Sequence, residues 1–143
     1  MNGTFHQHPN GGGFMSSSAH ADDIALIGAY CVVYDTAKVL GNARLEDFAR
    51  AFGDARICDS AVICGDAKVS GNACVSGNAR VSMEAHGSEH AIVRGNATVC
   101  GRAVVRGSAS VDDNACVGGR SRVSDNAFVA GATLIAADMI VVE

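Results

Sequence analysis

Two histidines and a carboxylate lie together in one short stretch of the chain. The stretch reads Ala85-His-Gly-Ser-Glu-His90, so that His86 and His90 lie on either side of Glu89. Histidine serves as a general base because its ordinary pKa lies near neutral pH, and a carboxylate can orient the imidazole ring. The stretch therefore predicts either a proton-transfer site or a polar pocket. The alternative interpretation is a tolerated irregularity of the chain.

Basic residues form the second candidate site. A guanidinium group binds two oxygens of a phosphate or carboxylate at once, so clustered arginines favour a small anionic ligand of phosphate-like or nucleotide-like chemistry. The alternative is that these arginines pair with aspartates such as Asp112, Asp113 and Asp125. The candidate ligand-binding residues are Arg102, Arg106, Arg120, Arg122, His86, Ser88, Arg50 and Lys68.

A six-residue repeat positions all of these residues. From Ala25 to Thr133 a small residue recurs at every sixth position, which gives nineteen consecutive hexads of the form Ala-x-Val-x-Gly-Asn. Alternating inward and outward residues are typical of a short strand, and the Gly-Asn that follows is typical of a turn. Each hexad is therefore expected to form one side of a coil, and stacked coils bury small apolar residues without one central core. The inner aliphatic row fails only at Ala51 and Gly87.

Runs such as Ala67-Lys-Val-Ser-Gly-Asn72 followed by Ala73-Cys-Val-Ser-Gly-Asn78 resemble the hexapeptide-repeat left-handed β-helix. The resemblance implies an all-β fold, a single-stranded left-handed parallel β-helix in which each triangular coil takes three hexads. The nineteen hexads would then make about six coils. It also implies a homotrimer, because related proteins commonly assemble through flat faces of the prism.

The repeat divides the chain into three parts. Residues 1–24 are rich in Gly, Ser, His and Asn and are expected to form an N-terminal cap or arm, because an uncovered coil end exposes strand edges. Residues 25–137 form the β-helix, and residues 138–143 form a closing C-terminal strand. The stretch from His8 to Phe14 resembles the start of small β-helix proteins often encoded by phages and prophages. That resemblance implies a host protein as an alternative partner.

The register assigns every outward residue to one of three faces. The face that starts at Cys31 is the most basic, and both lapses of the inner row fall on it. It also carries residues 83–90, which we expect to be locally distorted and to line a pocket or a cleft between subunits. The other two faces carry small or apolar residues along much of their length and are expected to make the trimer contacts.

The resemblance also implies an enzymatic alternative, because hexapeptide-repeat proteins are best known as acyltransferases that use coenzyme A. His86 or His90 would then be the catalytic base, oriented by Glu89. Such enzymes have an inserted loop over the acceptor, and nineteen unbroken hexads leave no room for one. A β-helix carbonic anhydrase would need three converging histidines, and the repeats supply two. We therefore predict a non-enzymatic binding or scaffold protein without a cofactor.

Composition argues against several other classes of protein. A formal net charge of −4 does not favour a nucleic acid polymer as partner. No apolar run is long enough to span a membrane and no signal peptide is evident, so we expect a cytoplasmic protein with reduced cysteines. Zinc sites usually contain close cysteine pairs, whereas the nearest cysteines, Cys58 and Cys64, fall on different sides of the predicted prism. We therefore expect no metal site.

Overall fold

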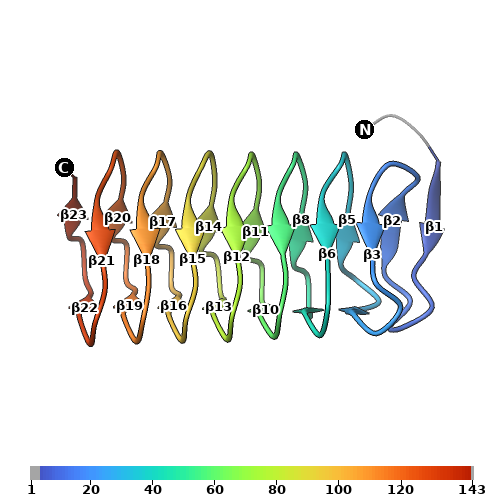
Figure 1. Cartoon of the computed structure of the whole chain (residues 1–143), viewed down its shortest axis with the longest axis horizontal. Coiled ribbons are helices and arrows are strands. Elements are labelled where there is room, and N and C mark those ends of the chain that lie inside the picture. The colour runs from blue at the N-terminus through green and yellow to red at the C-terminus, as the bar shows by residue number, and fades with distance from the viewer. Residues whose placement is uncertain (1–3, 143) are drawn as a thin grey trace.

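The computed structural model describes residues 4–142, which form a parallel β-solenoid of about seven turns. Figure 1 shows the coils stacked in sequence order, with the N-terminal strand β1 at one end and β23 at the other. The predicted all-β parallel fold is confirmed, and the stack is longer than the six coils expected. Over the described range no helix has the length and apolar character needed to cross a membrane.

Successive strands rotate among three sheets, so that each coil contributes one short strand to each sheet. Sheet A contains β1 (Phe5–Gln7), β2 (Phe14–Ser16), β5 (Val32–Val33), β8 (Arg50–Ala51), β11 (Lys68–Val69), β14 (His86–Gly87), β17 (Val104–Val105), β20 (Arg122–Val123) and β23 (Ile140–Val141). Sheet B contains β3 (His20–Ala21), β6 (Lys38–Val39), β9 (Arg56–Ile57), β12 (Cys74–Val75), β15 (Ile92–Val93), β18 (Ser110–Val111) and β21 (Phe128–Val129). Sheet C contains β4 (Leu26–Ile27), β7 (Arg44–Leu45), β10 (Val62–Ile63), β13 (Arg80–Val81), β16 (Thr98–Val99), β19 (Cys116–Val117) and β22 (Leu134–Ile135).

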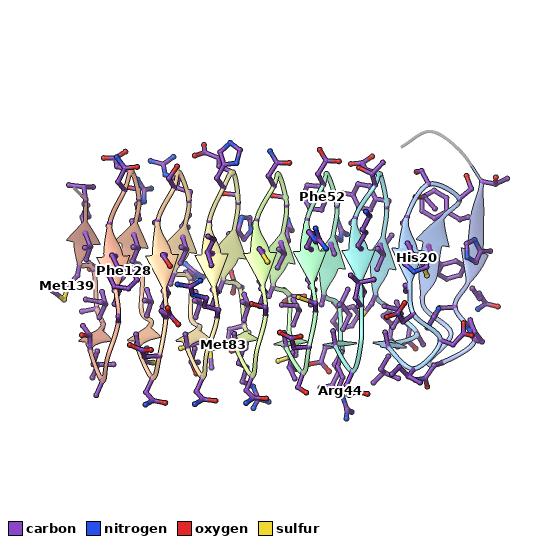
Figure 2. The ribbon with its side chains drawn as sticks, viewed as in Figure 1. His20, Arg44, Phe52, Met83, Phe128 and Met139 are labelled. Atoms are coloured by element: carbon purple, nitrogen blue, oxygen red, sulfur yellow. The ribbon has the colours of Figure 1, made fainter. Side chains whose placement is uncertain are left out.

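The lead residue and the aliphatic residue of each hexad fill the lumen. Ala67 and Val69, for example, are fully buried, whereas Lys68 between them points outward. The same alternation repeats on each coil, so equivalent residues stack eighteen positions apart. Figure 2 shows the outward side chains projecting from all sides of the stack. The chain therefore has a narrow apolar interior and places its polar chemistry on three outer faces.

From Asp35 to Ala137 a residue with positive φ turns each corner of the coil. Glycine and aspartate occupy most of these positions, and Met83 and Glu89 adopt the same conformation, with φ of 60° and 58°. Strand β14, between these two corners, keeps the regular register with β11 and β17. Residues 83–90 therefore follow the ordinary coil and not the distorted path expected from the sequence. At the Glu89 corner the side chain accepts a hydrogen bond from the backbone N–H of Gly107 on the next coil.

Gly87 leaves an empty place in the inner row. It is a Cα partner of Val69 on one side and of Val105 on the other. A Cβ atom added to Gly87 would meet no atom within 4 Å. The position that an aliphatic side chain fills in most hexads is therefore open space in the lumen at Gly87. The backbone does not move inward to close it.

The N-terminal segment covers the first coil and then joins the stack. Strand β1 pairs antiparallel with β2. The loop between them is hydrogen-bonded to Ile27 of β4: the N–H of Ile27 donates to the carbonyl of Asn10 at 3.0 Å, and the N–H of Gly13 donates to the carbonyl of Ile27 at 2.9 Å. A Cβ on Gly11 would collide with the carbonyl oxygen of Ile27, so the glycine run permits this close approach.

The coil begins earlier than the boundary at residue 25 expected from the repeat. Strands β2 and β3 already stack parallel on β5 and β6, because Met15 and Ala21 take inward positions without the regular hexad turn. At the other end β23 pairs with β20 and continues sheet A. Residues 1–3 and 143, which the expected cap and closing strand include, lie outside the described residues.

Candidate functional site

Three basic side chains stack on successive coils of sheet A. Arg50 on β8, Lys68 on β11 and His86 on β14 are Cα partners across the sheet. They point outward, because the second residue of each of these strands is buried in the lumen. The three residues line a groove of about 420 Å³, a volume in the range of small-molecule sites. We call this row the basic column.

The other wall of the groove comes from the corner that leads into sheet A. Phe48, Asp66 and Glu84 lie there, each two residues before a member of the basic column. They are also eighteen residues apart, so they stack on successive coils. The strand positions alone do not predict that these three residues form a wall, whereas their eighteen-residue spacing does. The groove therefore places an aromatic ring and two carboxylates beside its cations.

Like charges are brought together in the basic column without ion pairs to neutralise them. Within residues 4–142, no carboxylate lies within 4.0 Å of the charged groups of Arg50 or Lys68. Burial, and then the positive charge of Lys68, lower the pKa of His86 below its ordinary value of 6.5. An anion in the groove would relieve the repulsion and favour the charged forms of these side chains.

Glu84 is only loosely engaged by another charged residue. The Nε atom of Arg102 lies 3.5 Å from Oε2 of Glu84, and both side chains are more than half exposed. An exposed pair of this kind contributes about 0–1 kcal/mol. The Glu84 carboxylate consequently keeps most of its capacity to accept hydrogen bonds from a ligand.

Aromatic side chains continue the site toward the N-terminus. The rings of Tyr30 and Phe48 stack at the corner, with centroids 5.5 Å apart, and those of Tyr34 and Phe52 stack at the other edge of sheet A, with centroids 4.9 Å apart. Phe52 is labelled in Figure 2. Phe48 is 57% exposed, so its ring remains available to a planar group in the groove.

The structure separates the basic candidate residues into two groups. Val104 on β17 comes between His86 and Arg122 in the same outward row. Ser88 follows β14 and is not among the residues that line the groove. The second group lies on the coil of Val104 and on the next coil and is called the arginine cluster: Arg102, Arg106, Arg120 and Arg122.

The turn aspartates do not neutralise the arginine cluster. Asp112 pairs instead with Arg94, with 2.8 Å between Nε and Oδ2, and Asp113 accepts a hydrogen bond from the backbone of Gly131 at 3.1 Å. Among the described residues, Asp112, Asp113 and Asp125 form no ion pair with the cluster within 4.0 Å. Within residues 4–142 the one ion pair of the cluster is that of Arg102 with Glu84, at 3.5 Å.

The two histidines do not converge on one site. His86 lies on the face of sheet A, and His90 lies at the far corner of the same hexad, where it is exposed. Glu89 accepts a hydrogen bond from the backbone N–H of Gly107 at 2.7 Å and so is held away from the role of orienting an imidazole. Of the two predicted catalytic residues, only His86 lines the groove.

No protein-family model, curated protein or solved structure matches this chain. The fold and the groove give the class of protein: a parallel β-solenoid with a groove on one sheet that is lined by basic side chains, two carboxylates and an aromatic ring. The part of the chain that the structure describes brings together no group of three or more His, Cys, Asp or Glu side chains suited to a metal ion.

Proposed function

We propose that this protein is a rigid, non-enzymatic binding protein whose groove on sheet A holds a small anionic ligand. The observation that carries the proposal is the basic column, in which Arg50, Lys68 and His86 stack on successive coils and line one groove. Arg50 and Lys68 carry positive charges on adjacent coils and have no ion-pair partner within 4.0 Å among the described residues, so they repel each other, and an anion shared between them removes that cost. Arginine and lysine also provide the hydrogen-bond donors that a phosphate group requires.

The other wall of the groove favours a nucleotide-like ligand over a bare anion. Asp66 and Glu84 can accept hydrogen bonds from hydroxyl groups beside a bound phosphate, and Phe48 can stack against a planar ring. A nucleoside monophosphate carries all of these groups. The arginine cluster extends the basic face and attracts anions toward it over a longer range.

The geometry supports binding more than acyl transfer. A general base needs a partner that orients its ring, and Glu89 is engaged by Gly107 on the next coil. The hexads also continue past the groove without an inserted loop that covers an acceptor. Coenzyme A is accordingly not part of this proposal.

The proposal includes membership of the hexapeptide-repeat class, with left-handed coils and assembly as a homotrimer. The rotation of successive strands among three sheets supports the class. Large apolar side chains on the two remaining sheets support the assembly, since Phe128 on sheet B and Leu134 on sheet C are 60% and 67% exposed. Native mass spectrometry tests the subunit number, and a monomer at micromolar concentration would contradict the trimer.

Calorimetric titration with adenosine monophosphate, inorganic phosphate and adenosine tests the ligand class. We expect saturable binding with one site per chain, tightest for the monophosphate and weakest for adenosine. The Arg106→Gln, Arg122→Gln double variant locates the site, because its affinity should change much less than that of a variant in the basic column. If the double variant loses binding while Lys68→Met retains it, the ligand sits on the arginine cluster and the groove assignment is wrong. Capture of a host protein with no small-ligand binding would also contradict it.

A further inference from the structure

Four of the six cysteines form two pairs with the same arrangement on different sheets. Cys74 is the Cα partner of Arg56 across sheet B, and Cys58 lies two residues after Arg56 on the same outward side. Cys116 and Cys100 are related in the same way on sheet C, through Thr98. Each pair is therefore a diagonal neighbour pair on adjacent coils. The sixteen-residue spacing that produces it differs from any short Cys-x-x-Cys motif.

The sulfur of Cys100 lies against the coil that carries Cys116. A Cβ on Gly118, two residues after Cys116, would be 3.2 Å from Sγ of Cys100, so the Cys100 sulfur reaches over the coil that carries Cys116. Burial raises the pKa of Cys100, and the next contribution comes from Cys116. The pKa of Cys58 is likewise raised by burial first and by Cys74 next. All four thiols are free and half-buried.

A bridging ion suits this diagonal geometry better than a disulfide does. Diagonal neighbours in a sheet have Cα atoms about 7–8 Å apart, whereas a disulfide rarely spans more than about 7 Å. A metal ion bridges a wider gap, because each bond from sulfur to metal adds about 2.3 Å. Zinc would require about four ligands, and the described residues offer no group of three or more. Soft cations such as Cu(I) select thiolates and accept a linear pair of them.

We propose that Cys58 with Cys74 and Cys100 with Cys116 form two dithiol sites, each of which binds one Cu(I) ion. Both thiols of a site lose their protons on binding, so one Cu(I) replaces two protons and the bis-thiolate complex carries a single negative charge. Arg56 lies beside the first pair and offsets that charge, since it acts to lower the pKa of Cys58. The sites lie on sheets B and C, apart from the groove on sheet A.

Native mass spectrometry of the reduced protein under anaerobic conditions tests this proposal. Cu(I) is supplied as its acetonitrile complex with a competing chelator, and we expect two ions per chain. Cys58→Ser and Cys100→Ser should each retain one ion, and the double variant should retain none at the same chelator concentration. Cys64→Ser is the matched control, because Cys64 is also half-buried and outward-facing but has Arg80 at the diagonal position. It should keep both ions. Circular dichroism confirms that the serine variants remain folded.

Three results would overturn the proposal. The first is a metal loss in Cys64→Ser equal to that in Cys58→Ser, the second is retention of both ions by the double variant, and the third is a metal count that follows the total number of cysteines. Each of these would show that single thiols bind the metal. A redox role would replace metal binding if two results occurred together. Hydrogen peroxide would convert the pairs to disulfides, with a mass loss of two hydrogens per pair, and the reduced protein would take up no Cu(I).

Discussion

The carboxylate of Glu89 accepts a hydrogen bond from the backbone N–H of Gly107 on the next coil, with 2.7 Å between Oε2 and N. The turn residues Asp47 and Asp59 make the equivalent contact with the glycine eighteen positions further on, at 3.0 Å in each case. Acidic side chains at these corners therefore form hydrogen bonds that link adjacent coils. The same contact explains how a glutamate holds a corner that usually takes glycine or aspartate.

Replacement of Glu89 by alanine should lower the free energy of unfolding by about 1 kcal/mol, because one hydrogen bond to a charged acceptor is lost from a partly solvated turn. Urea unfolding measures this change, and ligand affinity should remain that of the wild type. Glu84→Ala provides the comparison. It should change ligand affinity with little effect on stability, because its pair with Arg102 is exposed. Equal effects of both variants on stability and on binding would argue against separate roles.

Gly87→Ala should stabilise the protein by about 0.5–1 kcal/mol. The added methyl group enters open space between Val69 and Val105, and alanine reduces the conformational freedom of the unfolded chain. Gly71→Ala is the control, because its φ is +62° and its Cβ would lie 2.7 Å from the backbone N of Glu89. That variant should be destabilised by about 1 kcal/mol or more. Thermal melting of both variants measures the effect, and a destabilised Gly87→Ala would show that the place is not empty.

His86 should make stability fall as the pH is lowered through the range below 6.5. Burial and Lys68 lower its pKa in the folded state, so the unfolded chain binds a proton at a higher pH than the folded chain does. The resulting loss of stability begins near pH 6.5 and is complete below the folded pKa. His86→Asn should reduce the slope of unfolding free energy against pH in that range. The exposed His90→Asn variant is the control, and an unchanged slope in His86→Asn would contradict the environment assigned to His86.

Phe48→Ala should weaken adenosine monophosphate binding severalfold and leave inorganic phosphate binding unchanged. The ring stacks only against the planar part of a nucleotide, and one aromatic stacking contact is worth about 0.5–1.5 kcal/mol. Phe128→Ala is the matched control, because Phe128 is similarly exposed but lies on sheet B. Equal losses for both ligands in Phe48→Ala would show that the ring supports the groove wall and does not contact a base.

The hexad register, together with the three hexads per coil implied by the family resemblance, predicted the parallel β-solenoid and the assignment of Arg50, Lys68 and His86 to one face. Inward and outward positions follow from alternation alone, so Val69 and Lys68 were placed correctly. The start of the coil was not predictable in this way, because Met15 takes an inward position in a segment without the regular turn residues. The expected distortion at residues 83–90 was wrong, because Met83 and Glu89 adopt the positive φ of the other corners and β14 keeps the regular register with its neighbours.

The far wall of the groove and the cysteine pairs depend on relationships between coils that a single hexad does not contain. Asp66 belongs to the hexad before the one that carries Lys68, and the two meet only because the chain turns a corner between them. Cys58 and Cys74 are diagonal neighbours only because adjacent coils stack in parallel register. Both features follow from the sequence once the coil length of eighteen residues is known.

The most direct measurement is the affinity of adenosine monophosphate for the wild type, Lys68→Met and Lys38→Met at one fixed salt concentration. Lys38 is the matched control, because it occupies the equivalent outward position on sheet B. Loss of a charge-assisted contact of at least about 1.4 kcal/mol corresponds to a tenfold change in affinity. We expect Lys68→Met to bind at least about tenfold more weakly and Lys38→Met to bind as the wild type does. Equal affinities of the two variants, or no saturable binding by the wild type, would contradict the groove as an anion-binding site.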